Sequence, residues 1–148
     1  ASNLMRNLKE MDGVVLIDAP GNLAQQGLIP IFSQADYVVC TFQYESTSVN
    51  STATFILFLA KLKEKFPGMH TETFFVVNRH DKRYGKKQEL ALWAKTDEHL
   101  SQYGLVTPKI EVKADMQRYN TIEVMSNQRD IVYPTFKFIC DHIFKDNE

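Results

Sequence analysis

Three short and almost uninterrupted apolar runs constrain the fold of this chain more than any other feature of its sequence. They occupy residues 14–17, 37–42 and 73–77, and each has the length and composition of a strand that is buried on both faces. Helix-length segments at 46–66 and 84–103 follow the second and third runs. Strands that alternate with helices in this way predict βαβ units. We therefore expect an α/β fold with a parallel sheet and flanking helices.

The remaining segments predict further helices and one strand at the edge of the sheet. We expect helices at 4–11, closed by Gly13, and within 23–34, broken near Pro30. Residues 109–113 alternate polar and apolar side chains, which is typical of an edge strand with one face in water. Two helices at 115–127 and 131–145 complete the prediction, and Gly104 is the expected C-cap of the helix at 84–103.

Length and composition favour a single globular domain over residues 1–148 in the cytoplasm. The chain has 148 residues, of which 44% are hydrophobic and 24% charged, and this composition argues against intrinsic disorder. The net charge of −1 argues against attraction of the whole surface to nucleic acid or lipid. The longest apolar run, at 55–60, is much shorter than the roughly 18 residues of a membrane span. The cysteines, Cys40 and Cys140, are interpreted as two buried thiols rather than a disulfide.

Polar residues follow two of the predicted strands, at the sheet edge where α/β proteins bind ligands. The first of these polar residues is Asp18, directly after the run at 14–17, and Gly21 lies three residues further along the chain. A carboxylate in this place can hold Mg²⁺ or its bound water, and a nearby glycine lets the backbone approach a γ-phosphate. The alternative interpretation is that Asp18 only caps the next turn.

The second polar group follows the strand at 73–77. The Asn78 amide can pair with the edge of a purine, the Arg79 guanidinium can stack on a base, and a carboxylate at Asp81 could accept two hydrogen bonds from guanine. The alternative is an ordinary polar turn. Basic residues continue this segment and could contact nucleic-acid phosphates, or could simply form a solvated turn; they are Lys82, Arg83, Lys86 and Lys87.

Three segments resemble one family of proteins. Residues 13–21, GVVLIDAPG, resemble the Walker B and switch segment of ParA/MinD-like partition ATPases, which carry a deviant Walker A loop. Residues 35–45, ADYVVCTFQYE, resemble the next strand of that family with its exit loop, and residues 74–79, FFVVNR, are similar to the strand whose asparagine meets adenine. Their order and spacing match over most of the chain. Within the family, the chain looks most like the ParA-type proteins of conjugative elements.

The resemblance implies a Rossmann-like P-loop NTPase that binds ATP and Mg²⁺. It implies that Asp18 positions Mg²⁺ through water, that Gly21 is the switch glycine and that Asn78, with Arg79, holds the base. It also implies an ATP-dependent homodimer, non-specific binding of DNA and an adaptor protein as partner. The cellular role would be the partition or maintenance of plasmid, chromosome or conjugative-element DNA.

One departure from the family is large, because the loop G-x-x-x-x-G-K-[ST] that cradles the phosphates is absent from this sequence. The one Gly-Lys pair, Gly85-Lys86, is followed by Lys87. We therefore expect the chain to be the C-terminal portion of a longer ATPase and to be inactive alone. Two alternatives stay open. One is a GTPase of the same superclass, because residues 18–21 fit D-x-x-G and residues 78–81 fit N-[KR]-x-D; the other is a non-catalytic binding or dimerisation module.

Overall fold

The computed structural model describes residues 2–25, 27–118 and 122–145, and the chain divides into two compact units. The first unit comprises Ala1–Val38 and Ser51–Glu72, and the second comprises Val39–Asn50 and Thr73–Glu148. The boundaries between these ranges fall within two strands and one helix, so each of these elements contributes residues to both units.

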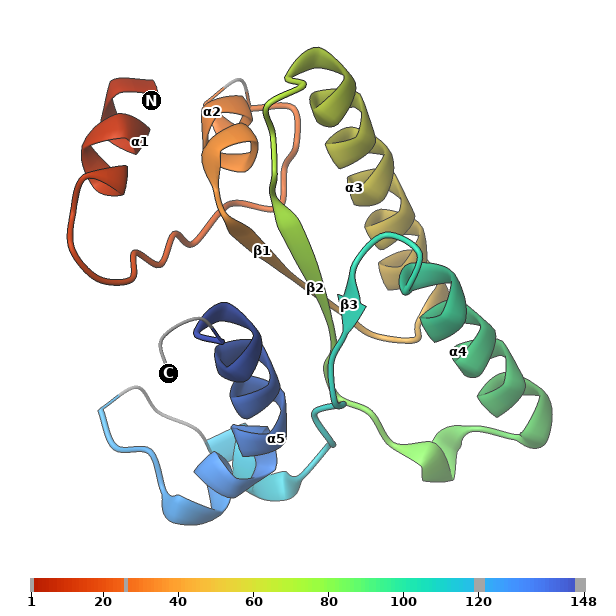
Figure 1. Ribbon diagram of the computed structural model, residues 1–148. Coiled ribbons are helices and arrows are strands. Elements are labelled where there is room, and N and C mark those ends of the chain that lie inside the picture. The colour runs from red at the N-terminus through yellow and green to blue at the C-terminus, as the bar shows by residue number, and fades with distance from the viewer. Residues whose placement is uncertain (1, 26, 119–121, 146–148) are drawn as a thin grey trace. The chain divides into compact units, whose positions relative to one another are not determined.

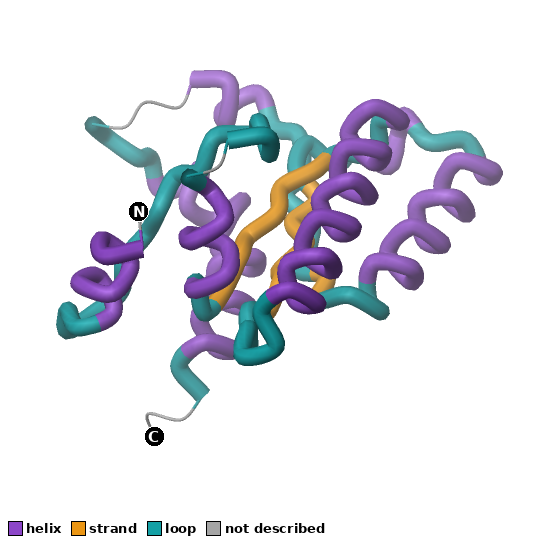
Figure 2. Tube along the Cα trace, turned by 90° about the horizontal axis from the view of Figure 1, so that it is seen from above, coloured by secondary structure: helices purple, strands orange, loops and turns teal. Residues whose placement is uncertain are grey.

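The sheet has three strands in the order β1-β2-β3, with β2 in the centre (Figure 1). The strands are β1 (Tyr37–Phe42), β2 (Glu72–Val77) and the short β3 (Leu105–Val106). β2 and β3 are parallel, and Phe74 is paired with Leu105. Helices flank the strands (Figure 2). The predicted α/β class, the parallel sheet and the strands at 37–42 and 73–77 are therefore confirmed.

β2 forms the core of the second unit. All of its residues after Glu72 are buried, and the side chains of Phe74, Phe75 and Val77 have no solvent exposure. This burial explains why its sequence is a continuous apolar run rather than an alternating one. A strand covered so completely provides a rigid base for the loop that follows it.

Pairing with β2 continues past β3, but irregularly. Thr107 donates its N–H to the Phe75 carbonyl at 3.0 Å, and Ile110 donates to Val77 at 2.9 Å. A single parallel bridge then joins His80 to Glu111. The edge strand predicted at 109–113 is therefore wrong: β3 lies earlier, at Leu105–Val106, and residues 109–113 contain only the isolated bridge at Glu111, which places this segment beside the loop after β2.

Five α-helices occur among the described residues. The longer three are α3 (Ser46–Lys65), α4 (Lys87–Leu100) and α5 (Ser126–Ile143), and the shorter two are α1 (Ser2–Lys9) and α2 (Leu28–Gln34). α4 begins later than predicted, because Tyr84 lies in the short 3₁₀ helix η1 (Lys82–Tyr84). The Glu89 carboxylate then accepts the Lys86 N–H at 2.6 Å and so starts α4 at the next residue.

The first unit has its own apolar core between α2 and α3. Leu28 and Phe32 of α2 are buried with Leu59 and Leu62 of α3. The Phe32 ring meets Phe55 edge-on, with ring centroids 5.4 Å apart. Part of the apolar surface of α3 is therefore covered by α2 within the first unit.

The strand predicted at 14–17 is wrong. These residues form no regular secondary structure, and their four side chains are between 39% and 90% exposed. A strand obtains its hydrogen bonds from a neighbouring strand, and among the described residues none pairs with this run. The preceding helix, α1, ends at Lys9 rather than at Gly13 as predicted, although Gly13 does have a positive φ, 108°.

The helix predicted at 115–127 is also wrong. Its first residues form a 3₁₀ helix, η2 (Ala114–Arg118), and residues 122–125 have no helical structure. A new helix, α5, begins at Ser126, where the Gln128 side chain accepts the Met125 N–H at 3.1 Å and donates to the Asp115 carbonyl at 2.8 Å. These bonds fix a helix start inside the predicted helix.

Among the residues that the structure describes, no helix combines the length and apolarity that are needed to span a membrane.

Candidate functional site

The loop after β2 turns sharply at its first two residues. Asn78 donates its N–H to the Phe42 carbonyl at 2.8 Å, which ties the end of β2 to the end of β1. Its side-chain oxygen accepts the Arg79 N–H at 2.8 Å. Arg79 has φ 56°, a left-handed conformation that is uncommon for a residue other than glycine. Both side chains are exposed, so this turn presents an amide and a guanidinium to solvent.

Asp81 and Arg83 form a two-pronged ion pair within the same loop. Nη2 of Arg83 donates to Oδ2 of Asp81 at 2.6 Å, and Nε donates to Oδ1 at 2.9 Å. The Arg83 backbone N–H also donates to Oδ1 at 3.0 Å. These bonds to the charged carboxylate lower the pKa of Asp81 to about 2, and the same pairing raises the pKa of Arg83.

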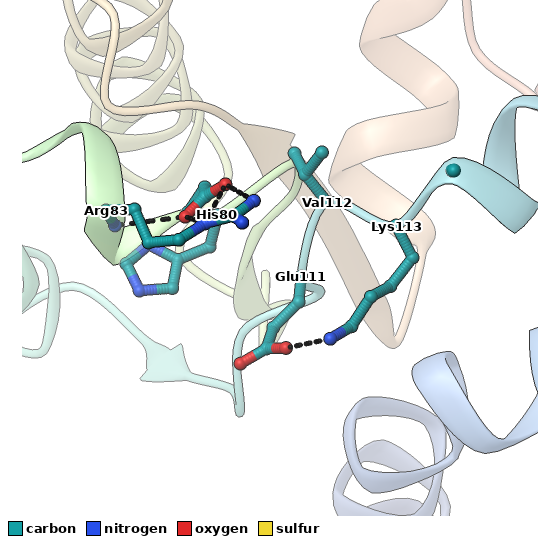
Figure 3. Close-up of a pocket in the computed structure, with 7 residues that line it drawn as sticks. His80, Arg83, Glu111, Val112 and Lys113 are labelled. Atoms are coloured by element: carbon teal, nitrogen blue, oxygen red, sulfur yellow. Dashed lines mark hydrogen bonds and ion pairs between the residues drawn. The ribbon is translucent and has the colours of Figure 1, made fainter.

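This ion pair forms one side of a pocket of about 380 Å³ at the carboxyl end of β2 (Figure 3). The opposite side is formed by residues 111–114, where Glu111 and Lys113 are paired at 3.1 Å. A volume of this size is within the range of small-molecule pockets, about 300–1,000 Å³. The lining residues are His80, Asp81, Arg83, Glu111, Val112, Lys113 and Ala114.

A cluster of aromatic and charged side chains supports His80. The Tyr44 hydroxyl donates to the Asp97 carboxylate at 2.6 Å, and the Lys109 ammonium contacts the same carboxylate at 2.8 Å. The Tyr44 ring stacks on Trp93 of α4 with centroids 4.8 Å apart. Burial, followed by the bond to Asp97, raises the pKa of Tyr44, so its hydroxyl stays protonated and acts as a donor.

The residues predicted from the first strand end lie in the first unit. Asp18 is exposed on the irregular segment that replaces the predicted strand. Gly21 has open space around it, since a Cβ built there would meet no atom within 4 Å. A carboxylate in this setting is accessible to a hydrated cation.

The residues predicted from the second strand end lie in the second unit, and the structure brings only part of them to the pocket. Arg83 lines it, whereas Asn78 and Arg79 lie at the adjoining turn and are not among the lining residues. Lys86 and Lys87 are exposed at the start of α4. The side chain of Lys82 lies outside the described part of the structure.

Sequence reasoning missed His80, Glu111 and Lys113 as residues of this pocket. A signal for them was present, because residues 109–113 were predicted as a strand of the same sheet. The carboxyl ends of parallel strands meet at one edge, so the end of that strand belongs beside the loop after β2. The signal was not recognised because the alternation of polar and apolar side chains at 109–113 is equally typical of an edge strand whose charged side chains only face solvent.

Comparison with family models, with curated proteins and with solved structures finds no match to this chain. Within the described residues, no group of three or more His, Cys, Asp or Glu side chains is placed to hold a metal ion.

Proposed function

We propose that this chain is the C-terminal portion of a ParA/MinD-type ATPase that acts in the partition or maintenance of plasmid, chromosome or conjugative-element DNA. In this proposal the second unit holds the adenine base of ATP, and the missing phosphate cradle lies upstream of Ala1. The chain alone is then a base-binding and dimerisation portion without hydrolytic activity.

The observation that carries the choice of base is the ion pair of Asp81 with Arg83. A guanine-specific carboxylate must accept hydrogen bonds from N1–H and the N2 amino group, and adenine lacks both donors. In this loop both oxygens of Asp81 already accept bonds from Arg83, at 2.6 and 2.9 Å. To read guanine, this carboxylate would have to leave Arg83 or accept further bonds beside it. The pairing supports the choice of adenine over guanine in this proposal.

The residues that line the pocket beside this loop suit a planar ligand of the size of a nucleobase. Val112 and Ala114 provide apolar contacts, and the Arg83 guanidinium, held flat by Asp81, provides a surface on which a ring can stack. Asn78, at the same strand end, offers an exposed amide for the purine edge. The apolar and stacking surfaces of the pocket, with the Asn78 amide at the adjoining turn, support the proposal of a bound base.

The proposal assigns Mg²⁺ to Asp18, with Gly21 as the switch glycine. Mg²⁺ is commonly held by one or two carboxylates together with substrate phosphates and water, so a single exposed carboxylate is compatible with that role. The chemistry that ATP and Mg²⁺ supply is phosphoryl transfer, in which the carboxylate positions the metal and its water. Non-specific DNA contacts by Lys82, Arg83, Lys86 and Lys87 and an adaptor partner belong to the same proposal.

Reading the codons upstream of Ala1 tests this proposal directly. We expect them to encode a strand, the loop G-x-x-x-x-G-K-[ST] with the additional lysine of this family, and a helix. An upstream reading frame without such a loop would contradict the ATPase assignment and favour the non-catalytic module.

A further inference from the structure

His80 connects the two sides of the pocket through its backbone. Its N–H donates to the Ile110 carbonyl at 2.9 Å, and its carbonyl accepts the Val112 N–H at 3.0 Å. These two bonds join the loop after β2 to the segment that ends in Glu111 and Lys113. A displacement of His80 would therefore change the relative position of both sides of the pocket.

The imidazole of His80 is held by two aromatic rings. Its centroid lies 5.8 Å from that of Tyr44 and 5.6 Å from that of Trp93, and it meets both rings edge-on, at 76° and 73°. Tyr44 is itself fixed by Asp97, and Trp93 belongs to α4. The ring of His80 is thus held in one position by Tyr44, which follows β1, and by Trp93 of α4.

Nδ1 of His80 is buried and has no hydrogen-bond partner among the described residues. The charged groups that act on this imidazole are Lys109, Glu111, Asp97 and Asp81. Each of the three carboxylates already has a cationic partner: Lys113 for Glu111, Lys109 for Asp97 and Arg83 for Asp81. A proton that made this half-buried imidazole cationic would therefore add a charge whose three neighbouring carboxylates already have cationic partners.

Physical chemistry favours the neutral ring in this environment. Burial disfavours the charged imidazolium, and the positive charge of Lys109 disfavours it further, so the pKa of His80 is lowered from its ordinary value of 6.5. In the unfolded chain the same ring would take up its proton at the ordinary value. The fold therefore loses stability as the pH falls from 6.5 through the lowered pKa.

We propose that His80 is a positioning residue whose protonation releases its ring from Tyr44 and Trp93 and loosens the bonds to Ile110 and Val112, so that the pocket changes shape in mild acid. The biological meaning of this switch rests on the proposed base-binding function, because that function gives the pocket its ligand. The switch itself needs no ligand and is tested without one.

The test is an NMR titration of the chain between pH 7.5 and 4.5 without nucleotide. The His80 imidazole should titrate with a midpoint below 6.5, and the backbone amide of Val112 should shift with the same midpoint. In His80→Phe, which keeps an aromatic ring but cannot take up a proton, the Val112 shift should vanish over this range. His99→Phe is the matched control, since His99 lies on the exposed side of α4, and there the Val112 shift should persist.

Three results would overturn the inference: a His80 midpoint at or above 6.5, a Val112 amide that does not follow it, or a Val112 shift that remains in His80→Phe. If His80→Phe does not fold, the first two observations on the unaltered chain decide alone. None of these results depends on ATP, so failure of the switch and failure of the proposed ATPase assignment are separately visible.

Discussion

Asp81 shows how a single neighbour decides the role of a residue. The sequence places a carboxylate where a GTPase would read guanine, and the structure pairs it with an arginine two positions later. Its side chain is 7% exposed, whereas that of Arg83 is 78% exposed. The sequence motif N-[KR]-x-D cannot reveal this pairing, because the motif does not specify the residues that come after its aspartate.

The pairing predicts the titration of Asp81. Because Arg83 stabilises the charged carboxylate, the NMR midpoint of Asp81 should be about 2, and Arg83→Gln should move it back toward the ordinary value of 3.8. The contribution of this pair to folding is present above pH 3.8 and is lost as the pH falls through about 2. Arg79→Gln, in the same loop, is the control and should leave the midpoint unchanged. A midpoint near 3.8 in the unaltered chain would contradict the pairing.

Gly104 is required by close packing rather than by its conformation. A Cβ at this position would overlap the carbonyl oxygen of Thr73 at the start of the buried part of β2. The sequence predicts this glycine as the C-cap of a helix, but α4 ends at Leu100 with Ser101 as its C-cap, and Gly104 lies in the turn beyond, where its N–H donates to the Leu100 carbonyl at 3.2 Å. The contact with β2 is a tertiary fact that no local pattern contains.

We expect Gly104→Ala to destabilise the second unit by about 1–3 kcal/mol, the usual cost of forcing atoms into a packed site. Gly27→Ala is the control, because a Cβ there meets nothing within 4 Å. Denaturant midpoints of both variants, followed by tryptophan fluorescence of Trp93, measure the difference. Equal midpoints in the two variants would contradict the prediction and would show that β2 and the turn at Gly104 can move apart at little cost.

At the scale of elements, the sequence predicts the interior better than the edges. The runs that became β1 and β2 and the helices α3 and α5 were found, because their apolar patterns have the length and period of a strand or a helix. Burial along almost the whole element is found only in β2 among these four, since a single residue of β1, Phe42, is buried. The apolar run at 14–17 has the same pattern and forms no strand. An apolar pattern identifies a segment that is suited to pairing, but the partner must come from elsewhere in the fold.

The exposed run at 14–17 predicts self-association of the isolated chain. Its apolar side chains are between 39% and 90% exposed, and among the described residues no strand pairs with its backbone, which is the condition that favours edge-to-edge pairing. Leu16→Lys should weaken association at least about tenfold, since burying a leucine contributes about 1.5–3 kcal/mol. Light scattering over a concentration series measures this, with Leu92→Lys as a control on α4 that is also exposed. A stable monomer of the unaltered chain at high concentration would contradict the prediction.

At the scale of the whole molecule, the proposal separates base binding from phosphate binding. In this proposal the pocket beside β2 contacts the base, whereas the loop that cradles phosphates is absent from the sequence. We therefore expect calorimetry of this chain with ATP and Mg²⁺ to show no tight binding. A submicromolar dissociation constant, equivalent to more than about 8 kcal/mol, would mean that the chain binds nucleotide by another route.

Competition between ATP and GTP for the full protein, including the residues encoded upstream of Ala1, tests the central claim most directly. The account predicts a preference for ATP, an affinity for ATP that stays within a few-fold in Asp81→Ala, and a loss of about tenfold or more in Asn78→Ala, equivalent to about 1.4 kcal/mol. A preference for GTP that disappears in Asp81→Ala would contradict it and assign the protein to the GTPases.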